Sequence, residues 1–360
     1  MTHQTMVEKE TSQFQDFLTG QVDVIIPTFN SERYIARCLR SVVGQGYPNL
    51  RLIVVDDGST DNTIGIVESF VPSVECVRLN ENRGPAAARN AGLRVCNGEF
   101  VAFLDSDDYW LPGFIDATVD FLKVHKAAIA VYTAFRAKKL KWGVFESLNV
   151  GGNPDIRPGQ GVIENTASFL TEHLPSVATG AAVMRLEVVR RTQGQREDLY
   201  AGEDKEFWAY LATFGHWGFI PKPFLTIDKV IVSPRQQWLK FRRRAVRLSD
   251  MTIESWEKRI RSRLSSVPKG TVVPTYFIVR LILMKAHTKR YNEARALAET
   301  QQHRFKGQSF RLVRLIRLGL RLPRALWPVL WVVYCACAWW KIHLSHAFNF
   351  IASIGREMEC

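Results

Sequence analysis

The feature that most constrains this 360-residue chain is an apolar run, residues 100–104, that ends in a cluster of carboxylates. The run predicts a buried strand, and Asp105, Asp107 and Asp108 follow it directly. In an open α/β sheet the carboxyl ends of the strands face the ligand crevice, where carboxylates can bind a divalent cation and its phosphates. The stretch therefore predicts a site for a metal–diphosphate. Alternatively, Ser106, Asp107 or Asp108 caps a helix that opens near Pro112.

Two earlier strands are predicted to end in polar residues in the same way. Residues 22–26, which are apolar except for Asp23, are expected to form a strand that stops at Pro27 and Thr28. A second expected strand, residues 50–55, runs straight into acidic residues. A carboxylate at such a strand end can accept a hydrogen bond from a ribose hydroxyl or a base N–H. Asp57 is favoured for that role because it precedes a glycine, where the backbone can turn tightly.

Helices are expected after both of these strands. Asn30 or Ser31 is expected to cap the first, whose apolar face lies within residues 34–42. The second is expected over residues 62–70, with Asp61 acting as a cap rather than as a ligand. A strand followed by a helix, twice in succession, predicts the start of a parallel sheet.

A third predicted strand, residues 74–79, leads to an arginine at the entrance of another helix. The small residues of segment 86–91 allow this helix to pack closely on the sheet. Arg83 lies at its N-terminus, where backbone amides and a guanidinium both favour a diphosphate. Arg89, within the helix, could equally make a structural ion pair.

Four segments, correctly ordered and spaced, carry a resemblance to a known family. They are residues 25–30, 54–61, 82–90 and 103–108. They resemble the family 2 glycosyltransferases, whose GT-A fold is a Rossmann-like, mostly parallel sheet flanked by helices. The match covers about residues 22–115 and continues more weakly to about residue 230.

The resemblance implies a nucleotide-sugar donor site. In that family the segment matching Pro27 and Thr28, together with the carboxylate matching Asp57, holds the base of the sugar nucleotide. The arginine matching Arg83 lies near the nucleotide as well. The expected donor is a UDP-sugar.

The resemblance also implies a metal site. Asp105 and Asp107 match the DxD motif, whose members touch the ribose and coordinate Mg²⁺ or Mn²⁺ on the diphosphate. The physical need is general, because a departing nucleoside diphosphate carries charge that must be neutralised as the glycosidic bond breaks.

The acidic pair Glu203 and Asp204 begins another predicted helix. Negative charge in a first helical turn is stabilised by the helix dipole, so a structural role is the simpler interpretation of the pair alone. The resemblance reverses this preference, because Asp204 matches the catalytic base of the family. A strand is expected at residues 128–135 and another at 177–184, with acceptor-selecting loops between them at residues 151–161.

The sequence departs from the family pattern after residue 225. A histidine that often assists the metal or the diphosphate is not evident, and Lys229, Arg235 or His216 is a possible substitute. Residues 235–238 do not complete the Gln-x-x-Arg-Trp motif of processive synthases, so a polymerase is not expected.

The chain is expected to divide into four parts. They are a flexible lead (residues 1–20), a GT-A catalytic domain (21–232), a helical appendage (233–307) and a membrane-associating segment (308–360).

The last of these parts has the pattern of a membrane-surface segment. Its arginines recur on one helical face, at Arg311, Arg314, Arg317 and Arg321, and favour an anionic leaflet. Residues 325–340 are uncharged and rich in tryptophan, but as a helix they would reach only ~24 Å of the ~30 Å hydrocarbon core. An interfacial or re-entrant segment is therefore expected rather than a full span, with burial against the catalytic domain as the alternative.

Composition favours a cytoplasmic enzyme at the inner face of the membrane. Six cysteines show no paired ligand spacing, and the polar N-terminus does not resemble a signal peptide. The net charge of +13 could indicate nucleic-acid binding, but no recognised nucleic-acid motif accompanies it.

The function expected is inverting transfer of a hexosyl or hexosaminyl group from a nucleotide sugar to a hydroxyl of a glycan or lipid-linked glycan. Such a reaction would serve surface polysaccharide or glycolipid synthesis. A catalytically inactive sugar-nucleotide-binding scaffold and a polyprenyl-phosphate sugar synthase are the alternatives. The sequence leaves open the donor sugar, the acceptor and the oligomeric state.

Overall fold

The computed structural model describes residues 17–140, 144–149, 161–164, 177–199, 202–229, 251–264 and 290–301, with scattered residues at 166–174 and 273–288. The chain divides into two compact units, residues 1–274 and 275–360. The β-sheet belongs to the first unit, and the second unit contains helix α12 (Tyr291–Thr300). The expected membrane segment, 308–360, and residues 1–16 of the expected lead lie outside the described residues.

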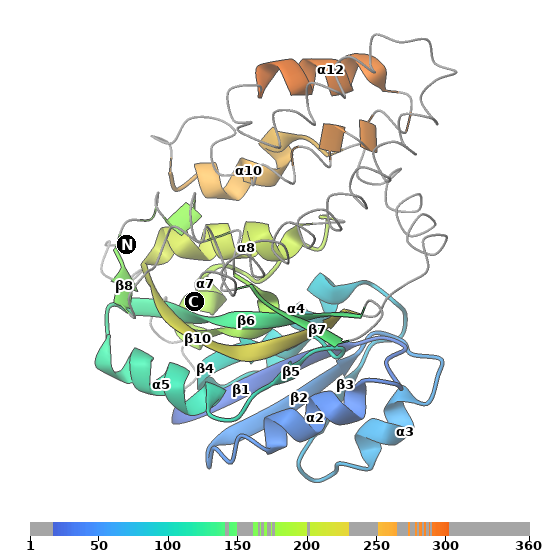
Figure 1. Cartoon of the computed structure of the whole chain (residues 1–360), viewed down its shortest axis with the longest axis vertical. Coiled ribbons are helices and arrows are strands. Elements are labelled where there is room, and N and C mark those ends of the chain that lie inside the picture. Colours follow the sequence, from blue (N-terminus) through green and yellow to red (C-terminus); the bar gives the residue numbers. More distant parts are fainter. Residues whose placement is uncertain are drawn as a thin grey trace, which may run out of the picture. The chain divides into compact units, whose positions relative to one another are not determined.

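Among the described residues, ten strands form one sheet with the order β3-β2-β1-β4-β9-β6-β10-β5, to which β7 and β8 add at β6 and β10 (Figure 1). The strands are β1 (Leu18–Thr28), β2 (Leu50–Asp56), β3 (Glu75–Arg78), β4 (Gly98–Phe103), β5 (Tyr109–Trp110), β6 (Ala128–Leu140), β7 (Val144–Asn149), β8 (Gly161–Ile163), β9 (Ala182–Arg185) and β10 (His216–Lys229). The block β3-β2-β1-β4 is parallel, as the repeated strand–helix pattern predicts.

Helices cover both faces of this sheet (Figure 1). One face carries α2 (Ile35–Val43), α3 (Thr63–Glu68) and α5 (Phe114–Val124), and the other carries α4 (Pro85–Val95), α7 (Leu186–Arg191) and α8 (Glu203–Leu211). The alternation along β1 explains this arrangement, because successive side chains of a strand point to opposite faces. Val24 and Ile26 join the core cluster that contains the buried side chains of α2. Ile25 points to α4, where a side chain at Gly92 would meet its Cγ2 atom at 2.5 Å.

The sheet is mixed rather than mostly parallel, which corrects the expected pattern. β9 runs antiparallel to both β4 and β6, and β5 runs antiparallel to β10. Because β9 is antiparallel to both of its neighbours, β6 runs in the same direction as β4. β10 is parallel to β6 and therefore shares this direction. Their carboxyl ends therefore lie at the same edge as the carboxyl ends of the parallel block.

The strand expected at residues 177–184 is only partly correct. Thr179–Ala181 form a 3₁₀ turn, and β9 begins at Ala182. The indole of Trp110 donates a hydrogen bond of 2.6 Å to the carbonyl of Gly180. Gly180 is also pressed between the side chains of Leu104 and Leu225, each 3.0 Å from where a Cβ would lie. This close packing explains why the backbone turns there before it joins the sheet.

The predicted helix caps are also corrected. Asn30 and Ser31 do not cap α2, because a turn separates them from its N-cap residue, Tyr34. The side chain of Asn30 instead accepts a hydrogen bond from the amide of Thr60. Helix α5 has Gly113 as its N-cap, so the acidic cluster after β4 does not cap it.

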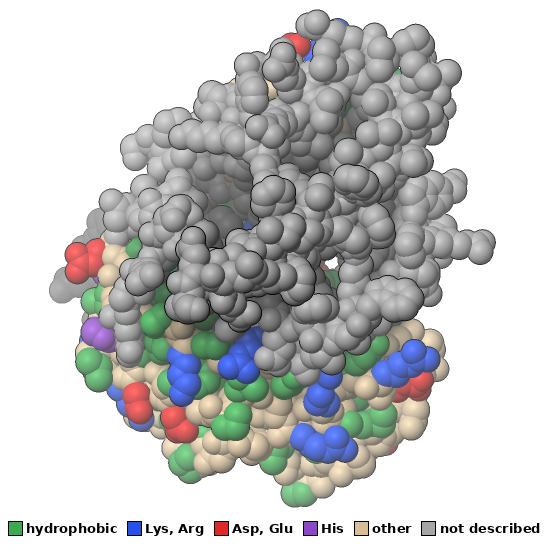
Figure 2. Space-filling model, in the orientation of Figure 1, with side chains coloured by type: hydrophobic (Ala, Val, Ile, Leu, Met, Phe, Trp, Pro, Cys, Tyr) green, Lys and Arg blue, Asp and Glu red, His purple; other side chains and the backbone are tan. Residues whose placement is uncertain are grey.

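The exposed surface of the first unit mixes charges of both signs. Figure 2 shows basic, acidic and apolar side chains interspersed over the described part of the visible face. In the part of the chain that the structure describes, no helix has the length and apolar composition needed to cross a bilayer.

Candidate active site

Three of the predicted site residues follow neighbouring strands at one edge of the sheet. Thr28 is the last residue of β1 and pairs with Asp56 of β2. The amide of Asp57 donates to the carbonyl of Thr28 over 2.8 Å, and β4, which precedes Asp105, is the neighbour of β1 on the other side. The parallel register thus brings Thr28, Asp57 and Asp105 to a common edge, as the sequence predicts.

Asp57 is held by backbone amides of the loop that follows β3. Its Oδ1 accepts from the amide of Arg83 and its Oδ2 from the amide of Gly84, each over 2.8 Å. The residue is only 3% exposed, and burial raises the pKa of its carboxyl while the two amides partly oppose this. Gly84 has φ +94°, a conformation that favours glycine, and it directly precedes Pro85 at the start of α4. Asp57 therefore fixes the entrance of α4.

Thr28 presents a buried hydroxyl at the same edge. The residue is 2% exposed, and its Oγ1 has no hydrogen-bond partner among the described residues. Buried polar groups in native proteins are nearly always paired, so an unpaired one at a strand end indicates a ligand or an ordered water. Pro27, the other residue predicted to contact the base, immediately precedes it in β1.

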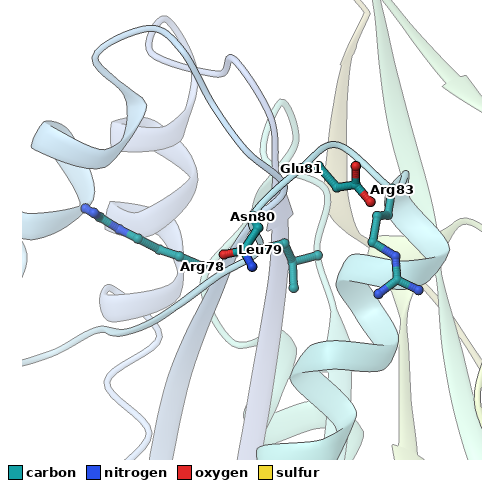
Figure 3. Close-up of a pocket in the computed structure, with 5 residues that line it drawn as sticks. All are labelled: Arg78, Leu79, Asn80, Glu81 and Arg83. Atoms are coloured by element: carbon teal, nitrogen blue, oxygen red, sulfur yellow. The ribbon is translucent and has the colours of Figure 1, made fainter.

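A pocket of about 350 Å³ lies beside this edge and is lined by Arg78, Leu79, Asn80, Glu81 and Arg83 (Figure 3). Figure 3 shows that the side chain of Arg78 points away from that of Arg83. The turn after β2 closes on the pocket loop, since a Cβ on Gly58 would lie 3.2 Å from the backbone of Glu81. Gly58 also has φ +78°, which agrees with the tight turn expected there.

Arg83 is engaged by an acidic residue that the sequence did not single out. Its Nη2 lies 2.8 Å from Oε2 of Glu197, and the other oxygen of Glu197 accepts from Nδ2 of Asn90 over 3.0 Å. Asn90 also accepts from the amide of Gln195 and donates to its carbonyl, each over 2.8 Å. The loop containing Gln195 and Glu197 is thereby fastened to α4.

The first carboxylate of the predicted metal motif is paired with a buried arginine. Nη2 of Arg89 lies 2.6 Å from Oδ1 of Asp105, and the Arg89 side chain is only 4% exposed. Nη1 of Arg89 donates to Oε1 of Gln195 over 3.1 Å. The structural ion pair considered for Arg89 is thus present, and its partner is a predicted site residue.

The second carboxylate of the motif, Asp107, is exposed. Its loop is held at two points: Nη2 of Arg37 donates to the carbonyl of Asp107 over 2.9 Å, and the hydroxyls of Ser106 and Ser31 lie 2.8 Å apart. Both anchors come from the segment after β1, so the loops that follow β1 and β4 are joined.

The donor set of this loop fits a hard divalent cation whose coordination is completed by substrate. Asp105 and Asp107 supply carboxylate oxygens, and within the described residues no group of three His, Cys, Asp or Glu side chains could form a complete metal cage. Mg²⁺ commonly binds in this way, through one or two carboxylates together with water and substrate phosphates.

The predicted base lies in the first turn of α8, close to the Asp105 loop. Gly202, with φ +73°, is the N-cap residue, and Glu203 and Asp204 follow it. The ring of Phe103, at the end of β4, packs against Phe207 of α8 with ring centroids 6.0 Å apart. The end of β4 and the start of α8 are therefore packed together, although they are far apart in sequence.

The charges of this region interact through Arg89. Burial alone would lower the pKa of Arg89, but the carboxylates of Asp105, Glu203 and Asp204 raise it. Burial raises the pKa of Glu203, as does the charge of Asp204, while Arg89 opposes the shift. One buried cation thus faces both acidic clusters that the sequence predicted to share a site.

His216 and Lys229, two of the residues considered as substitutes for the family histidine, lie at opposite ends of β10. His216 begins β10, where it pairs with Ala128 at the start of β6, and its ring contacts the carbonyl of Glu164 at 3.0 Å. It is therefore at the amino ends of the strands, opposite the site edge, and cannot assist a metal there. Lys229 ends β10 at the site edge; its side chain, and all of Arg235, lie outside the described part of the chain.

Part of the chain is similar to known glycosyltransferases. Residues 23–192 match the family model described as "Glycosyl transferase family 2". An Escherichia coli protein named UDP-Glc:alpha-D-GlcNAc-diphosphoundecaprenol beta-1,3-glucosyltransferase WfaP is 35% identical over 129 residues, which cover 35% of this chain and 51% of that protein. The putative teichuronic acid biosynthesis glycosyltransferase TuaG of Bacillus subtilis is 38% identical over 112 residues, 30% of this chain and 44% of the relative.

Solved structures share the architecture. The crystal structure of residues 1–349 of Staphylococcus aureus TarS in complex with UDP superposes with a TM-score of 0.50 at 23% identity, covering 83% of this chain and 88% of that one. This likeness shows the fold, which is GT-A. The matches span about half or less of the length of the two curated relatives above.

Proposed function

We propose that this chain, whose residues 23–192 form a family 2 glycosyltransferase domain, transfers a sugar from a nucleotide-sugar donor to a hydroxyl group with inversion at the anomeric carbon. The observation that carries the proposal is that Arg89 pairs with Asp105, at the donor edge, and also interacts electrostatically with Glu203 and Asp204 in the first turn of α8. An acidic group that only stabilised the helix dipole of α8 would not need a position beside the predicted donor loop.

The donor half of the site is proposed to bind the nucleotide. The unpaired Thr28 hydroxyl, Pro27 and the carboxylate of Asp57 supply polar and apolar contacts for a base, and Arg83 borders the adjacent pocket. The printed name of WfaP specifies UDP-glucose as its donor, which supports a UDP-sugar here. Asp105 and Asp107 would hold Mg²⁺ or Mn²⁺, which when bound would neutralise charge on the departing diphosphate.

Asp204 is proposed as the general base. It would accept the proton of the acceptor hydroxyl as the oxygen attacks the anomeric carbon, and the nucleoside diphosphate would leave from the opposite side. Arg89 would keep Asp105 oriented and lower the electrostatic cost of placing Glu203 and Asp204 beside it. The water-excluding core under α8, formed by Phe103, Phe207 and Trp208, keeps this turn rigid.

The acceptor class is proposed from the relatives. The names of WfaP and TuaG refer to a diphosphoundecaprenol-linked sugar and to teichuronic acid. A glycan or lipid-linked glycan is therefore the proposed acceptor, in surface polysaccharide synthesis. A lipid-linked acceptor would agree with the membrane contact expected for residues 308–360 and with a position at the inner face of the cell membrane.

The substitution Asp204→Asn tests the function directly. We expect turnover of UDP-glucose to fall by about 10²- to 10⁴-fold, because a positioned general base is lost, while donor binding stays intact. Turnover is measured with Mn²⁺ as release of UDP, and binding by calorimetric titration of UDP-glucose. A variant that loses binding and turnover equally would show that Asp204 is structural, and a wild-type protein that binds the donor without turning it over would favour the inactive scaffold.

The substitution Asp107→Ala tests the metal. We expect UDP-glucose affinity in the presence of Mn²⁺ to fall by at least about 10-fold, because a carboxylate ligand is removed, and affinity in EDTA to stay unchanged. The measurement is the same titration with and without the cation. Equal affinities for wild type and variant under both conditions would remove Asp107 from the metal site.

A further inference from the structure

Helix α10 (Ile253–Arg261) approaches α8 through a buried ion pair that the reaction scheme does not use. Arg259 binds Glu206 with two parallel bonds of 2.6 Å, Nε to Oε1 and Nη2 to Oε2. Glu206 is 0% exposed, so its carboxylate depends on this guanidinium for charge compensation. A bidentate arginine–carboxylate pair also fixes the orientation of both partners.

The same arginine holds the loop that precedes α8. Nη1 of Arg259 donates to the carbonyls of Thr192 and Gly194, over 3.0 and 2.9 Å. Its guanidinium lies over the ring of Tyr210 in α8, 4.4 Å from the centroid. Every nitrogen of this side chain is therefore engaged by α8 or by the preceding loop.

That loop leads to the donor side of the site. Gln195, next to Gly194, is bound by Asn90 and by Arg89, and Arg89 pairs with Asp105. A continuous set of contacts thus runs from α10 to the predicted metal loop. It passes only through side chains and backbone groups that are buried or partly buried.

A second residue of α10 contacts the start of α8. The indole Nε1 of Trp256 donates to the carbonyl of Gly202 over 3.2 Å, and that carbonyl also accepts from the amide of Glu206 over 2.9 Å. Gly202 is the N-cap residue of α8 and lies two positions before Asp204. Trp256 itself is fully buried.

We infer that α10 is a positioning element for the base, with Arg259 as its principal positioning residue. Glu206 lies two positions after Asp204, and side chains so spaced on a helix point in nearly opposite directions. Arg259 therefore binds α8 on the side opposite Asp204. It fixes the position of the first turn without contacting the reacting groups. The inference deepens the proposed function and rests on it for the identity of the base.

Arg263 provides a matched control on the same face, one turn further along. Its guanidinium also stacks on an aromatic ring, Phe214, at 3.9 Å, and its Nε donates to the hydroxyl of Thr213 over 3.0 Å. It is exposed and binds no buried carboxylate among the described residues. Arg263→Gln removes an arginine–aromatic contact without affecting the first turn of α8.

The test compares Arg259→Gln, Arg259→Lys and Arg263→Gln in the full-length chain, using UDP-glucose with Mn²⁺. We expect Arg259→Gln to lower kcat by about 10²-fold with KM unchanged, because misplacement of a catalytic group costs this much without altering donor binding. Arg259→Lys, which keeps the charge but not the bidentate fork, should recover part of the loss. Arg263→Gln should behave as wild type.

A readout independent of turnover accompanies the kinetics. Hydrogen exchange, followed by mass spectrometry, should accelerate at the amides of residues 203–206 in Arg259→Gln and stay unchanged in Arg263→Gln. If Arg259→Gln does not fold, Trp256→Phe, which removes the indole donor to Gly202 and reduces the volume of a buried ring, should show the same acceleration and a smaller loss of kcat.

The outcomes separate the two proposals. Unchanged kcat and unchanged exchange in Arg259→Gln would overturn the positioning role and leave the function standing. A wild-type protein without turnover would overturn the function, and faster exchange at residues 203–206 in Arg259→Gln would still support α10 as the element that orders this turn.

Discussion

The two halves of the site hold their carboxylates by different means. In the donor half, Asp57 is fixed by the backbone amides of Arg83 and Gly84. The other half surrounds the proposed general base Asp204 and is called the base half here. In it, Glu206 is fixed by the guanidinium of Arg259, which is 53 residues away in sequence. Every residue except proline supplies a backbone N–H, whereas a guanidinium is lost on substitution of the arginine by any other residue. The base half should therefore depend on individual side chains far more than the donor half does.

Asp105 combines both arrangements. The parallel pairing of β4 with β1 places it at the site edge, and this placement depends on backbone hydrogen bonds. The direction of its carboxylate depends on the side chain of Arg89. Position is thus set by the sheet, and orientation by one buried cation.

The largest expected effect is on stability and comes from a double-mutant cycle on Arg259 and Glu206. Arg259→Gln should lower the free energy of unfolding by about 3 kcal/mol, because it leaves the carboxylate of Glu206 buried without a counter-charge. Adding Glu206→Gln should restore much of this loss, because two neutral amides can replace the charged pair. The measurement is urea unfolding followed by tryptophan fluorescence.

A more exposed ion pair at the amino ends of β2 and β3 serves as the control for this cycle. Arg51 and Glu75 pair at 2.6 Å across β2 and β3, with side chains 28% and 43% exposed. Glu75→Gln should cost less than about 1 kcal/mol, as exposed ion pairs usually do. Equal losses at the two pairs would show that the buried Arg259–Glu206 pair contributes no more to stability than an exposed pair does.

An intermediate effect is expected where the two halves meet, at the pair of Arg83 with Glu197. Glu197 pairs with Arg83, so if Arg83 binds a donor phosphate as proposed, Glu197→Gln should free its guanidinium and tighten UDP-glucose binding. The expected gain is about 1.5- to 5-fold, the equivalent of one exposed ion pair. The gain should vanish in an Arg83→Gln background, as measured by calorimetric titration. A gain that persists there would show that Arg83 does not contact the donor.

The donor half could be predicted from the sequence because its determinants are local. Apolar runs that end in polar residues identified β1, β2 and β4, and parallel pairing then brought Thr28, Asp57 and Asp105 to one edge. Gly58 indicated the tight turn that the structure has at φ +78°.

Less of the base half could be predicted from the sequence, because its contacts join residues that are far apart in the chain. Arg259 lies in a helix rich in basic residues, and nothing local distinguishes it from the exposed Arg263. Its role depends on a buried carboxylate in another helix, which the sequence pattern does not reveal. The same applies to Gln195 and Glu197, whose partners, Arg89, Asn90 and Arg83, lie in and just before α4. The 3₁₀ turn before β9 was missed because the packing of Gly180 against Leu104 and Leu225 is also non-local.

The smallest expected effect concerns Glu203 and the pH dependence of stability. Burial and the charge of Asp204 raise the pKa of Glu203 in the folded chain above its value in the unfolded chain. The folded state therefore holds this proton more tightly, and at neutral pH the ionised carboxylate opposes folding. Glu203→Gln should raise Tm slightly at about pH 7.5, and the gain should shrink as the pH falls through the raised pKa towards about pH 5.

Asp198 supplies a comparison of opposite sign. Its hydrogen bonds with Arg196 lower its pKa, so ionised Asp198 favours folding at neutral pH. Asp198→Asn should lower Tm at about pH 7.5, with the loss fading as the pH falls through the range in which the unfolded chain takes up the proton. Tm is followed by circular dichroism across this range. If Glu203→Gln behaved like Asp198→Asn, the Glu203 carboxylate would be stabilised by Arg89 more than it is opposed by burial and Asp204. The acidic first turn of α8 would then be stabilised by its pairing with Arg89. It would not be a cluster in which Glu203 and Asp204 repel each other at a cost to stability.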